Sequence, residues 1–159
     1  SLSKMVQIWE KDPFPHGDPR LPHHVYPPRR ITPDDLFKRT GAHVWMVNIS
    51  DPVSVSKRVT TLKLDRGYGR EDILILDGSN STNFIEKLDD LFVIRTHIEE
   101  QAQLILEGEA YFDIEDGENW IRILCEAGDL LTIPENTMFR IITTPKNFYK
   151  MKRFFKGEE

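Results

Sequence analysis

Residues 101–134, QAQLILEGEAYFDIEDGENWIRILCEAGDLLTIP, contain four short runs in which apolar side chains recur at every second position. Successive side chains of a β-strand point to opposite faces, so this period of two predicts half-buried strands. The runs cover 101–106, 110–114, 120–124 and 130–133, and they are separated by Glu107-Gly108, Asp116-Gly117-Glu118 and Ala127-Gly128-Asp129. Glycine beside acidic side chains is typical of tight turns, so the four strands are expected to be antiparallel neighbours.

The same pattern continues on both sides of this stretch, at Phe92–His97, Phe139–Thr143 and Phe148–Phe155. Seven short strands at about ten-residue spacing are typical of an antiparallel sandwich or barrel. We therefore predict a mainly β fold whose barrel core spans residues 91–156. Cys125, the only cysteine, follows the run 120–124 and is predicted to be a buried structural thiol.

The first half of the chain predicts a mixed structure. Residues 11–33 are rich in proline, which lacks an amide donor and favours an extended arm over the surface. His43–Ile49 alternates as a strand. Helices are predicted at Pro33–Arg39, capped by Thr32 and Gly41, at Pro52–Leu64, ended by Gly67-Tyr68-Gly69, and at Thr82–Leu88. Residues 1–159 are expected to form one domain in which 1–90, an arm with helices, decorates the barrel.

Composition argues against several classes of function. The chain has a net charge of −5 and its Lys and Arg residues form no dense cluster, which disfavours nucleic-acid binding. No apolar run approaches the roughly 18 residues of a spanning helix, and no secretory leader is visible, so we expect no membrane insertion. A single cysteine allows no intramolecular disulfide, which suits the cytoplasm.

Five motifs, in this order, resemble those of the acireductone dioxygenase family, which belongs to the cupin superfamily. They are Asp18-Pro19-Arg20-Leu21-Pro22-His23, Gly67-Tyr68 to Asp72-Ile73, Ile105 to Ile114, Trp120-Ile121-Arg122-Ile123 and Gly128 to Pro134. The resemblance runs from about Val6 to Glu158 and implies a cupin-type antiparallel barrel. It also implies an ancestral role in methionine salvage, in which the family oxidises an acireductone with iron or nickel.

In the family, as the resemblance implies, a His-x-His pair, a Glu four residues later and a late His hold the metal. Counted back from Ile105 to Gly108, these positions are Arg95, His97, Gln101 and Phe139. Arginine is always cationic and phenylalanine offers no ligand atom, so one of the four ligands is retained. The former substrate pocket corresponds to Gln103, Arg140 and Ile141, with Gln103 in place of an arginine.

We therefore interpret the chain as a degenerate paralogue with no catalytic residues, no metal ligands and no cofactor. Arg95, Gln101 and an interior His97 are expected to form a polar cluster in which Arg95 donates to Gln101 or Glu99, with Phe139 as an aromatic plug. A site rebuilt from His97 with Glu99 or Glu100 would have two ligands, too few for tight binding of a reactive metal. His43, His23 or His24 would have to reach in from the first half, which nothing in the sequence requires. His97 could instead be a relic ligand, although a hydrogen-bonded interior histidine is favoured. His23-His24 could be a metal-binding pair, although solvated loop histidines are commoner.

For function, the leading hypothesis is a pseudoenzyme that binds another protein, through the arm between Pro13 and Arg30 or through a barrel edge. The resemblance adds the nucleus to the cytoplasm as a location, because family members are known in both. Two alternatives stay open. One is a metal-dependent acireductone dioxygenase with residual or altered activity, and the other is a cupin that binds a small ligand in its barrel.

Overall fold

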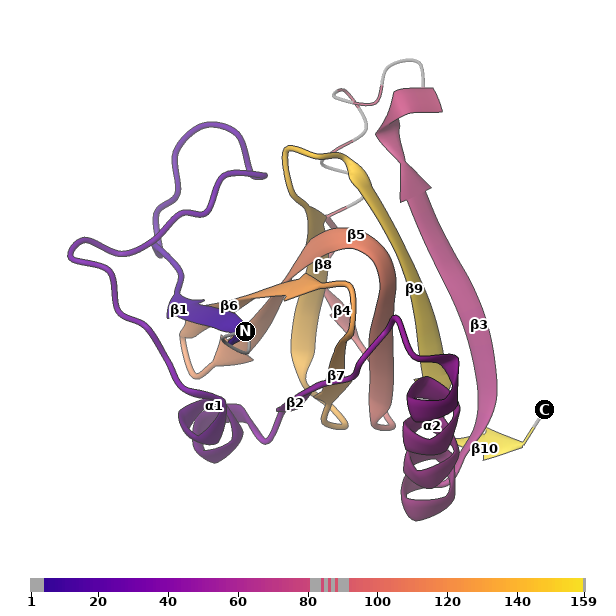
Figure 1. The fold of residues 1–159 in the computed structure, drawn as a ribbon. Coiled ribbons are helices and arrows are strands. Elements are labelled where there is room, and N and C mark those ends of the chain that lie inside the picture. Colours follow the sequence, from indigo (N-terminus) through magenta and orange to yellow (C-terminus); the bar gives the residue numbers. More distant parts are fainter. Residues whose placement is uncertain (1–4, 81–83, 85, 87, 89–91, 159) are drawn as a thin grey trace.

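The computed structural model of the chain, described here for residues 5–80, 84, 86, 88 and 92–158, is a strongly curled sheet with two helices outside it (Figure 1). Its strands pair antiparallel except for the short last one, which is parallel to its neighbour. In chain order the elements are β1 (Gln7–Glu10), α1 (Pro33–Thr40), β2 (His43–Met46), α2 (Pro52–Arg66), β3 (Tyr68–Asp77), the 3-10 turn Gly78–Asn80, β4 (Arg95–Thr96), β5 (Gln101–Asp116), β6 (Asn119–Glu126), β7 (Asp129–Ile133), β8 (Met138–Thr143), β9 (Phe148–Phe155) and β10 (Gly157–Glu158). The expected mainly β architecture is confirmed.

The long strand β5 joins two parts of the sheet. Its first half lies between β7 and β9, and these continue to β2 and to β3, with the short β10 beyond β3. Its second half lies between β6 and β8, which continue to β1 and β4. Because one strand serves both parts, the sheet must curl around its own inner face, and the inner face becomes the core.

Both described helices begin and end at the predicted residues or close to them. The Thr32 hydroxyl accepts a hydrogen bond from the amide of Asp35 at 3.1 Å, and Gly41, at φ +80°, ends α1. Asp51 caps α2, which continues two residues beyond the predicted Leu64 and ends at Gly67 in the left-handed conformation. Local capping chemistry therefore fixes the helix boundaries.

Several strands differ from the prediction. The two strands expected at 101–106 and 110–114 are one strand, β5, because an irregularity between Ile105 and Glu107 absorbs the predicted break. The strands expected at His43–Ile49 and Phe92–His97 shorten to His43–Met46 and Arg95–Thr96. The strands β1, β3 and β10 were not predicted, so the first half does not merely decorate the barrel, since it supplies β1, β2 and β3. The predicted helix Thr82–Leu88 falls mostly outside the described residues.

Gly108 lies where β5 bends, and its conformation allows a test of the fold. At φ +74°, a Cβ on this residue would lie 2.4 Å from the carbonyl oxygen of Phe148 in β9. Gly117 has a similar φ of +63° but nothing within 4 Å of a Cβ. Gly117→Ala should therefore cost about 1–2 kcal/mol of unfolding free energy from backbone strain alone. Gly108→Ala should cost about 1–3 kcal/mol more from overpacking, as measured by urea denaturation. Equal costs would contradict the close approach of β5 and β9.

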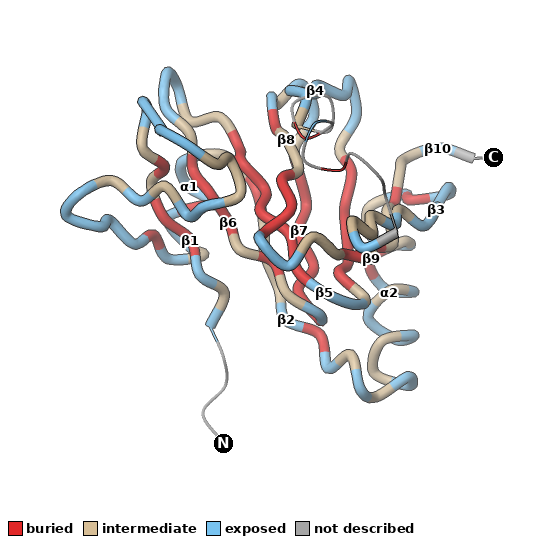
Figure 2. Tube along the Cα trace, turned by 90° about the horizontal axis from the view of Figure 1, so that it is seen from above, coloured by how far each residue is buried: buried red, intermediate tan, exposed pale blue. Residues whose placement is uncertain are grey.

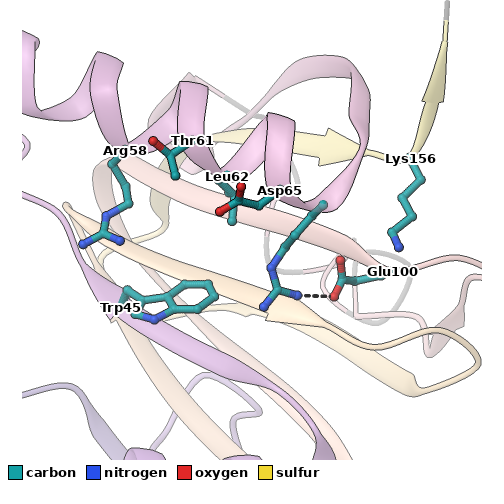
Figure 3. A pocket seen from close by; sticks show the side chains of 8 residues that line it. Trp45, Arg58, Thr61, Leu62, Asp65, Glu100 and Lys156 are labelled. Carbon is teal, nitrogen blue, oxygen red and sulfur yellow. Dashed lines mark hydrogen bonds and ion pairs between the residues drawn. The ribbon is translucent and has the colours of Figure 1, made fainter.

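The core has three clusters of buried residues around β5: an inner compartment, an outer compartment, and a smaller cluster of Trp9, Tyr111 and Ile142. Figure 2 shows the buried stretches of the chain in red. The inner compartment includes Ile105, Phe112, Phe139 and Met151, and it also contains Cys125, which is fully buried as predicted. The outer compartment lies under α2, where Leu62 packs with Leu104, Leu130 and Phe154. The helix leaves a pocket of about 520 Å³ between itself and β2 (Figure 3).

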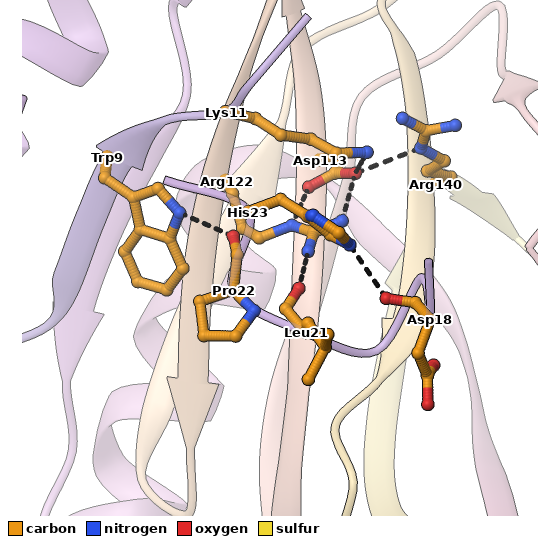
Figure 4. A network of polar contacts seen from close by, with 9 residues as sticks. All are labelled: Trp9, Lys11, Asp18, Leu21, Pro22, His23, Asp113, Arg122 and Arg140. Carbon is orange, nitrogen blue, oxygen red and sulfur yellow. Dashed lines mark hydrogen bonds and ion pairs between the residues drawn. The ribbon is translucent and has the colours of Figure 1, made fainter. Parts of the chain in front are cut away.

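The arm between β1 and α1 is bound to the sheet by a buried ionic cluster (Figure 4). The Asp113 carboxylate, fully buried on β5, accepts hydrogen bonds from Arg122 at 2.7 and 2.9 Å, from Lys11 at 3.0 Å and from Arg140 at 3.0 Å. Arg122 also donates to the carbonyl of Leu21 in the arm at 2.7 Å. The predicted extended arm is thus held in place through the cluster rather than lying free.

None of the helices in the described part of the chain is both long and apolar enough to cross a membrane.

Candidate functional site

Three of the four positions that correspond to the metal ligands lie together at one end of the sheet. Arg95 on β4 is the cross-strand neighbour of Phe139 on β8. The His97 ring stacks on Phe139, with ring centroids 5.7 Å apart and an interplanar angle of 29°. Phe139 is 2% exposed, whereas Arg95 and His97 are exposed. The site therefore has a buried aromatic base and a solvent-facing cationic rim.

The expected polar cluster does not form as predicted. Arg95 donates no hydrogen bond to Gln101 or Glu99 among the described residues, and His97 lies at the surface instead of in the interior. The reason is geometric, since β4 is a short edge strand at the rim, whereas Gln101 lies inside at the start of β5, opposite Ile133 and Phe155. The aromatic plug, by contrast, is present, because Phe139 packs in the inner core.

Two buried glutamines face the inner side of the sheet. Gln101 is 2% exposed and Gln103 is 1% exposed. The amide nitrogen of Gln101 and both amide atoms of Gln103 have no hydrogen-bond partner within the described part of the protein. A buried amide without a hydrogen-bond partner costs free energy of folding. The packing of the sheet therefore does not explain why these two polar side chains lie here.

The other two pocket positions, Arg140 and Ile141, lie on opposite faces of β8. Ile141 packs against the inner core. Arg140 points to the other side, where it binds Asp113 and lies 4.8 Å from the centre of the Trp120 ring. Because side chains alternate along a strand, Arg140 cannot share the inner face with Phe139. Arg140 therefore lies on the other face of β8 from Phe139, and the assignment of Gln103, Arg140 and Ile141 to a former substrate pocket stays a prediction.

Sequence reasoning missed the strand β9 as part of this site. The Phe155 ring lies 6.4 Å from the His97 ring, and the Arg153 guanidinium lies 5.4 Å from the centre of Phe155. Arg153 in turn forms a two-bond ion pair with Asp72 on β3 at 2.6 and 2.8 Å. The alternation of 148–155 predicted a strand, but its pairing with β3 could not be read from the sequence because β3 itself was not recognised.

The cationic rim lowers the pKa of His97. Its partial burial disfavours the imidazolium, and the positive charges of Arg95 and Arg153 act in the same direction. On the strand β9, burial raises the pKa of Tyr149 to about 12, although the same two arginines oppose the shift. The site therefore favours a neutral imidazole beside fixed positive charge.

Removal of the Arg95 charge should raise the pKa of His97 towards its ordinary value of about 6.5. We expect an upward shift in Arg95→Gln, read from the imidazole proton signals in an NMR titration. Lys38→Gln, an equal change of charge on α1, should leave the His97 titration unchanged. An unaltered His97 pKa in Arg95→Gln would show that the arginine does not act on this ring.

The donor chemistry of these positions does not fit the four-ligand set. Arg95 is a cation, Phe139 has no donor atom, and a neutral amide replaces the carboxylate at Gln101. Glu100, considered as a substitute, instead pairs with Arg66 and accepts from the hydroxyl of Tyr68 at 2.6 Å. Within the described ranges, no group of three His, Cys, Asp or Glu side chains is arranged to hold an ion.

The remaining histidines do not complete the site. His23 contacts the Asp18 carbonyl at 2.7 Å, and His24 packs against Trp9 with centroids 4.4 Å apart. His43 stacks between Phe37 and Trp45 on the outer side of the sheet. Each of these rings has a structural contact away from His97.

The fold is that of a known metalloprotein. The structure is similar to an acireductone dioxygenase from Bacillus anthracis with a cadmium ion in its active centre, with a TM-score of 0.74, 19% identity and coverage of 98% of this chain and 95% of the other. This likeness confirms the cupin-type fold. It also contradicts the expectation of no cofactor, because a metal ion occupies the active centre of a protein with this fold.

The sequence matches the ARD/ARD' family over residues 7–159. It is 53% identical to "Probable inactive acireductone dioxygenase 2" of Caenorhabditis elegans, covering 98% of this chain and 99% of the relative. It is also 36% identical to "Acireductone dioxygenase" of Drosophila melanogaster, covering 97% of this chain and 82% of the relative. The relatives thus include proteins named as acireductone dioxygenases and proteins named as probably inactive ones. The chain belongs to the acireductone dioxygenase family.

Proposed function

We propose that this chain is a member of the acireductone dioxygenase family that does not catalyse the dioxygenase reaction and acts by binding another protein. The observation that carries the first part is the stacked pair of His97 and Phe139, with Arg95 directly opposite Phe139 on the neighbouring strand. A phenylalanine buried at the position of the late histidine fills space that a ligand atom would need. Its neighbour Arg95 adds a permanent positive charge to the same end of the sheet.

The surrounding residues support the same conclusion. Gln101 and Gln103 replace a carboxylate and an arginine, so the chain lacks both an anionic ligand and the cation expected to face an anionic substrate. The sequence identity of 53% to a relative named as probably inactive agrees with this proposal.

An activity assay tests this part. With iron(II) or nickel(II) added, the chain should consume acireductone no faster than the enzyme-free solution, while the Drosophila melanogaster relative serves as the positive control. Retained His97 is the residue on which any residual activity would depend. Metal-dependent turnover that is lost in His97→Ala would contradict the proposal and favour the alternative of an altered dioxygenase.

Protein binding is supported by the surface that the fold presents. The arm, anchored by Arg122 and Trp9, exposes Phe14 and Tyr26 to solvent at 77% and 99%. A fixed segment with exposed aromatic side chains is a common feature of protein interaction sites. A cytoplasmic or nuclear location fits a chain whose one cysteine is a buried free thiol. Affinity purification from native extract should yield a stoichiometric partner, and its absence would contradict this part.

A further inference from the structure

A long groove runs between β2 and α2, on the outer side of the sheet and away from the stacked pair of His97 and Phe139. It consists of two adjoining hollows of about 520 and 410 Å³ that share Arg58 and Thr61. The helix contributes one wall, with side chains from Ser54 to Arg66. The other wall consists of Trp45 and Met46 of β2 and of Val47, the residue after the strand. Figure 3 shows the deeper half, with Trp45 beneath the helix and Glu100 and Lys156 at its far end.

The strand at this groove has an unpaired edge. β2 pairs with β7 on one side, and no other strand of the described residues lies along its second side. An edge strand presents backbone amide and carbonyl groups to which another extended chain can add. A helix running beside such an edge makes a channel in which the added strand would contact side chains as well as backbone.

The groove carries an excess of positive charge. Its lining contains four cationic side chains, Lys57, Arg58, Arg66 and Lys156, against the two carboxylates of Asp65 and Glu100. Arg66 is paired with Glu100, whereas no ion pair occupies Lys57, Arg58 or Lys156 within the described part of the chain. This local excess stands out on a chain whose net charge is −5. Charge complementarity therefore favours an acidic occupant.

The apolar part of the groove includes an aromatic side chain that is packed between its neighbours. The Trp45 ring is parallel to the His43 ring, with an interplanar angle of 8° and centroids 5.1 Å apart, and the Arg66 guanidinium lies 5.3 Å from its centre. Met46, the next residue of β2, is 49% exposed. An ordered aromatic side chain beside an exposed methionine gives a partner apolar contact without the entropy cost of ordering a loop.

From the free edge, the adjoining helix and the unpaired cations, we infer that β2 and α2 form the docking groove for an extended acidic segment of a partner protein. This inference rests on the protein-binding part of the proposed function and names the surface and the chemistry of the partner. The segment adds to β2 as a further strand. Its carboxylates lie on the same face as Trp45, towards Arg58 and Lys156 of that hollow and the neighbouring Lys57, and its apolar side chains lie on the opposite face, beside Met46.

The probe is a peptide of about eight residues with alternating glutamate and valine. Its binding to the isotopically labelled full chain is followed by NMR. We expect saturable binding with a Kd below about 1 mM, and amide shifts concentrated in 43–47 and 54–66. Two control peptides should bind at least about tenfold more weakly. One has lysine in place of glutamate, and the other is N-methylated at alternate amides, which blocks strand pairing.

Charge reversal locates the site. Lys57→Glu with Arg58→Glu should weaken binding of the glutamate–valine peptide by at least about tenfold. Lys38→Glu on α1 is the matched control, with Phe14→Ala and Tyr26→Ala as the control for the arm, and both should change the Kd less than about twofold. All these positions are exposed, so the thermal midpoint of each variant should stay close to that of the unmodified chain.

Four outcomes would overturn the inference: no saturable binding at about 1 mM peptide, equal binding of the lysine peptide, equal binding of the N-methylated peptide, or binding of a single-stranded oligonucleotide in place of the acidic peptide. The groove can also be wrong while the wider proposal of protein binding is right. A natural partner that is captured equally well by the Lys57→Glu and Arg58→Glu variant would overturn the groove and leave protein binding intact. The inactivity of the site is measured separately and depends on neither result.

Discussion

Replacement of Asp113 by asparagine should lower the free energy of unfolding by about 3–5 kcal/mol, because it breaks a buried ion pair by removing one partner. Asp113 and Arg122 are fully buried and Lys11 is 7% exposed, so these two cations would keep little contact with bulk water, whereas Arg140 is partly solvated. The introduced amide also points hydrogen-bond donors at guanidinium donors. The loss should therefore exceed that of the hydrogen bonds alone.

The matched control is Asp72→Asn, the same substitution in a two-bond pair with Arg153. The Asp72 side chain is 45% exposed, so water screens the pair and its loss should cost about 0–1 kcal/mol. Urea denaturation of both variants measures the difference. In Asp113→Asn the arm should also become sensitive to protease between β1 and α1, because Lys11 and the Arg122 contact with Leu21 depend on the carboxylate. Equal costs for the two variants would contradict the anchoring role of the cluster.

The same cluster predicts how stability depends on pH. Burial by itself would raise the pKa of Asp113, but the hydrogen bond and charge of Arg122, together with Lys11 and Arg140, hold that pKa below its ordinary value. A carboxyl with a depressed pKa in the folded state contributes stability above its unfolded pKa of about 4, and the contribution is lost as pH falls further. Asp113→Asn should lack this part of the acid dependence.

A second large effect is expected when the missing ligands are put back. The variant Arg95→His, Gln101→Glu and Phe139→His provides three ligand groups, two of them beside His97 on β4 and β8 and the third inside the sheet at the start of β5. Residues 95 and 139 are direct neighbours, and His97 already contacts Phe139 and Phe155. We expect nickel(II) to bind this variant at least about a hundredfold more tightly than the unmodified chain, as measured by calorimetry.

Folding of this variant has its own readout, because Phe139→His places a polar ring in the core. Nickel(II) should raise its thermal midpoint, since a ligand that binds the folded state stabilises it. The control carries the same three kinds of substitution at exposed positions, Arg29→His, Gln7→Glu and Phe14→His, and should show no such gain. Unchanged nickel affinity in the ligand variant would mean that the four positions do not converge.

The parts of the fold that local chemistry determines were predictable from the sequence. The caps Thr32 and Gly41, the turn residues Gly117 and Gly128, and the strand alternation through 101–155 all agree with the structure. The strand β3 was not predicted, because Ile73 and Ile75 on its outer side are apolar yet 44% and 57% exposed, so its pattern does not alternate between polar and apolar. The curl of the sheet depends on long-range pairing, which no local pattern specifies.

In the site, too, some features could be predicted from the sequence and others could not. The identities of Arg95, Gln101 and Phe139 could be read by counting along the motifs, and so could the burial of Phe139. Their contacts could not, because they depend on how far β4 extends along β8. Counting predicted Arg95 near Gln101, whereas the two-residue length of β4 keeps Arg95 at the rim. The ring of Phe155 and the charge of Arg153 enter the site only through the pairing of β9 with β5.

The most direct test of the central claim is a side-by-side measurement of acireductone consumption by the unmodified chain and by the Arg95→His, Gln101→Glu, Phe139→His variant, the latter with Gln103→Arg added. Both proteins are loaded with iron(II) or nickel(II) under the same conditions. The account predicts no turnover above the enzyme-free rate for the unmodified chain and measurable turnover for the variant. Turnover by the unmodified chain that matches or exceeds that of the variant would contradict it.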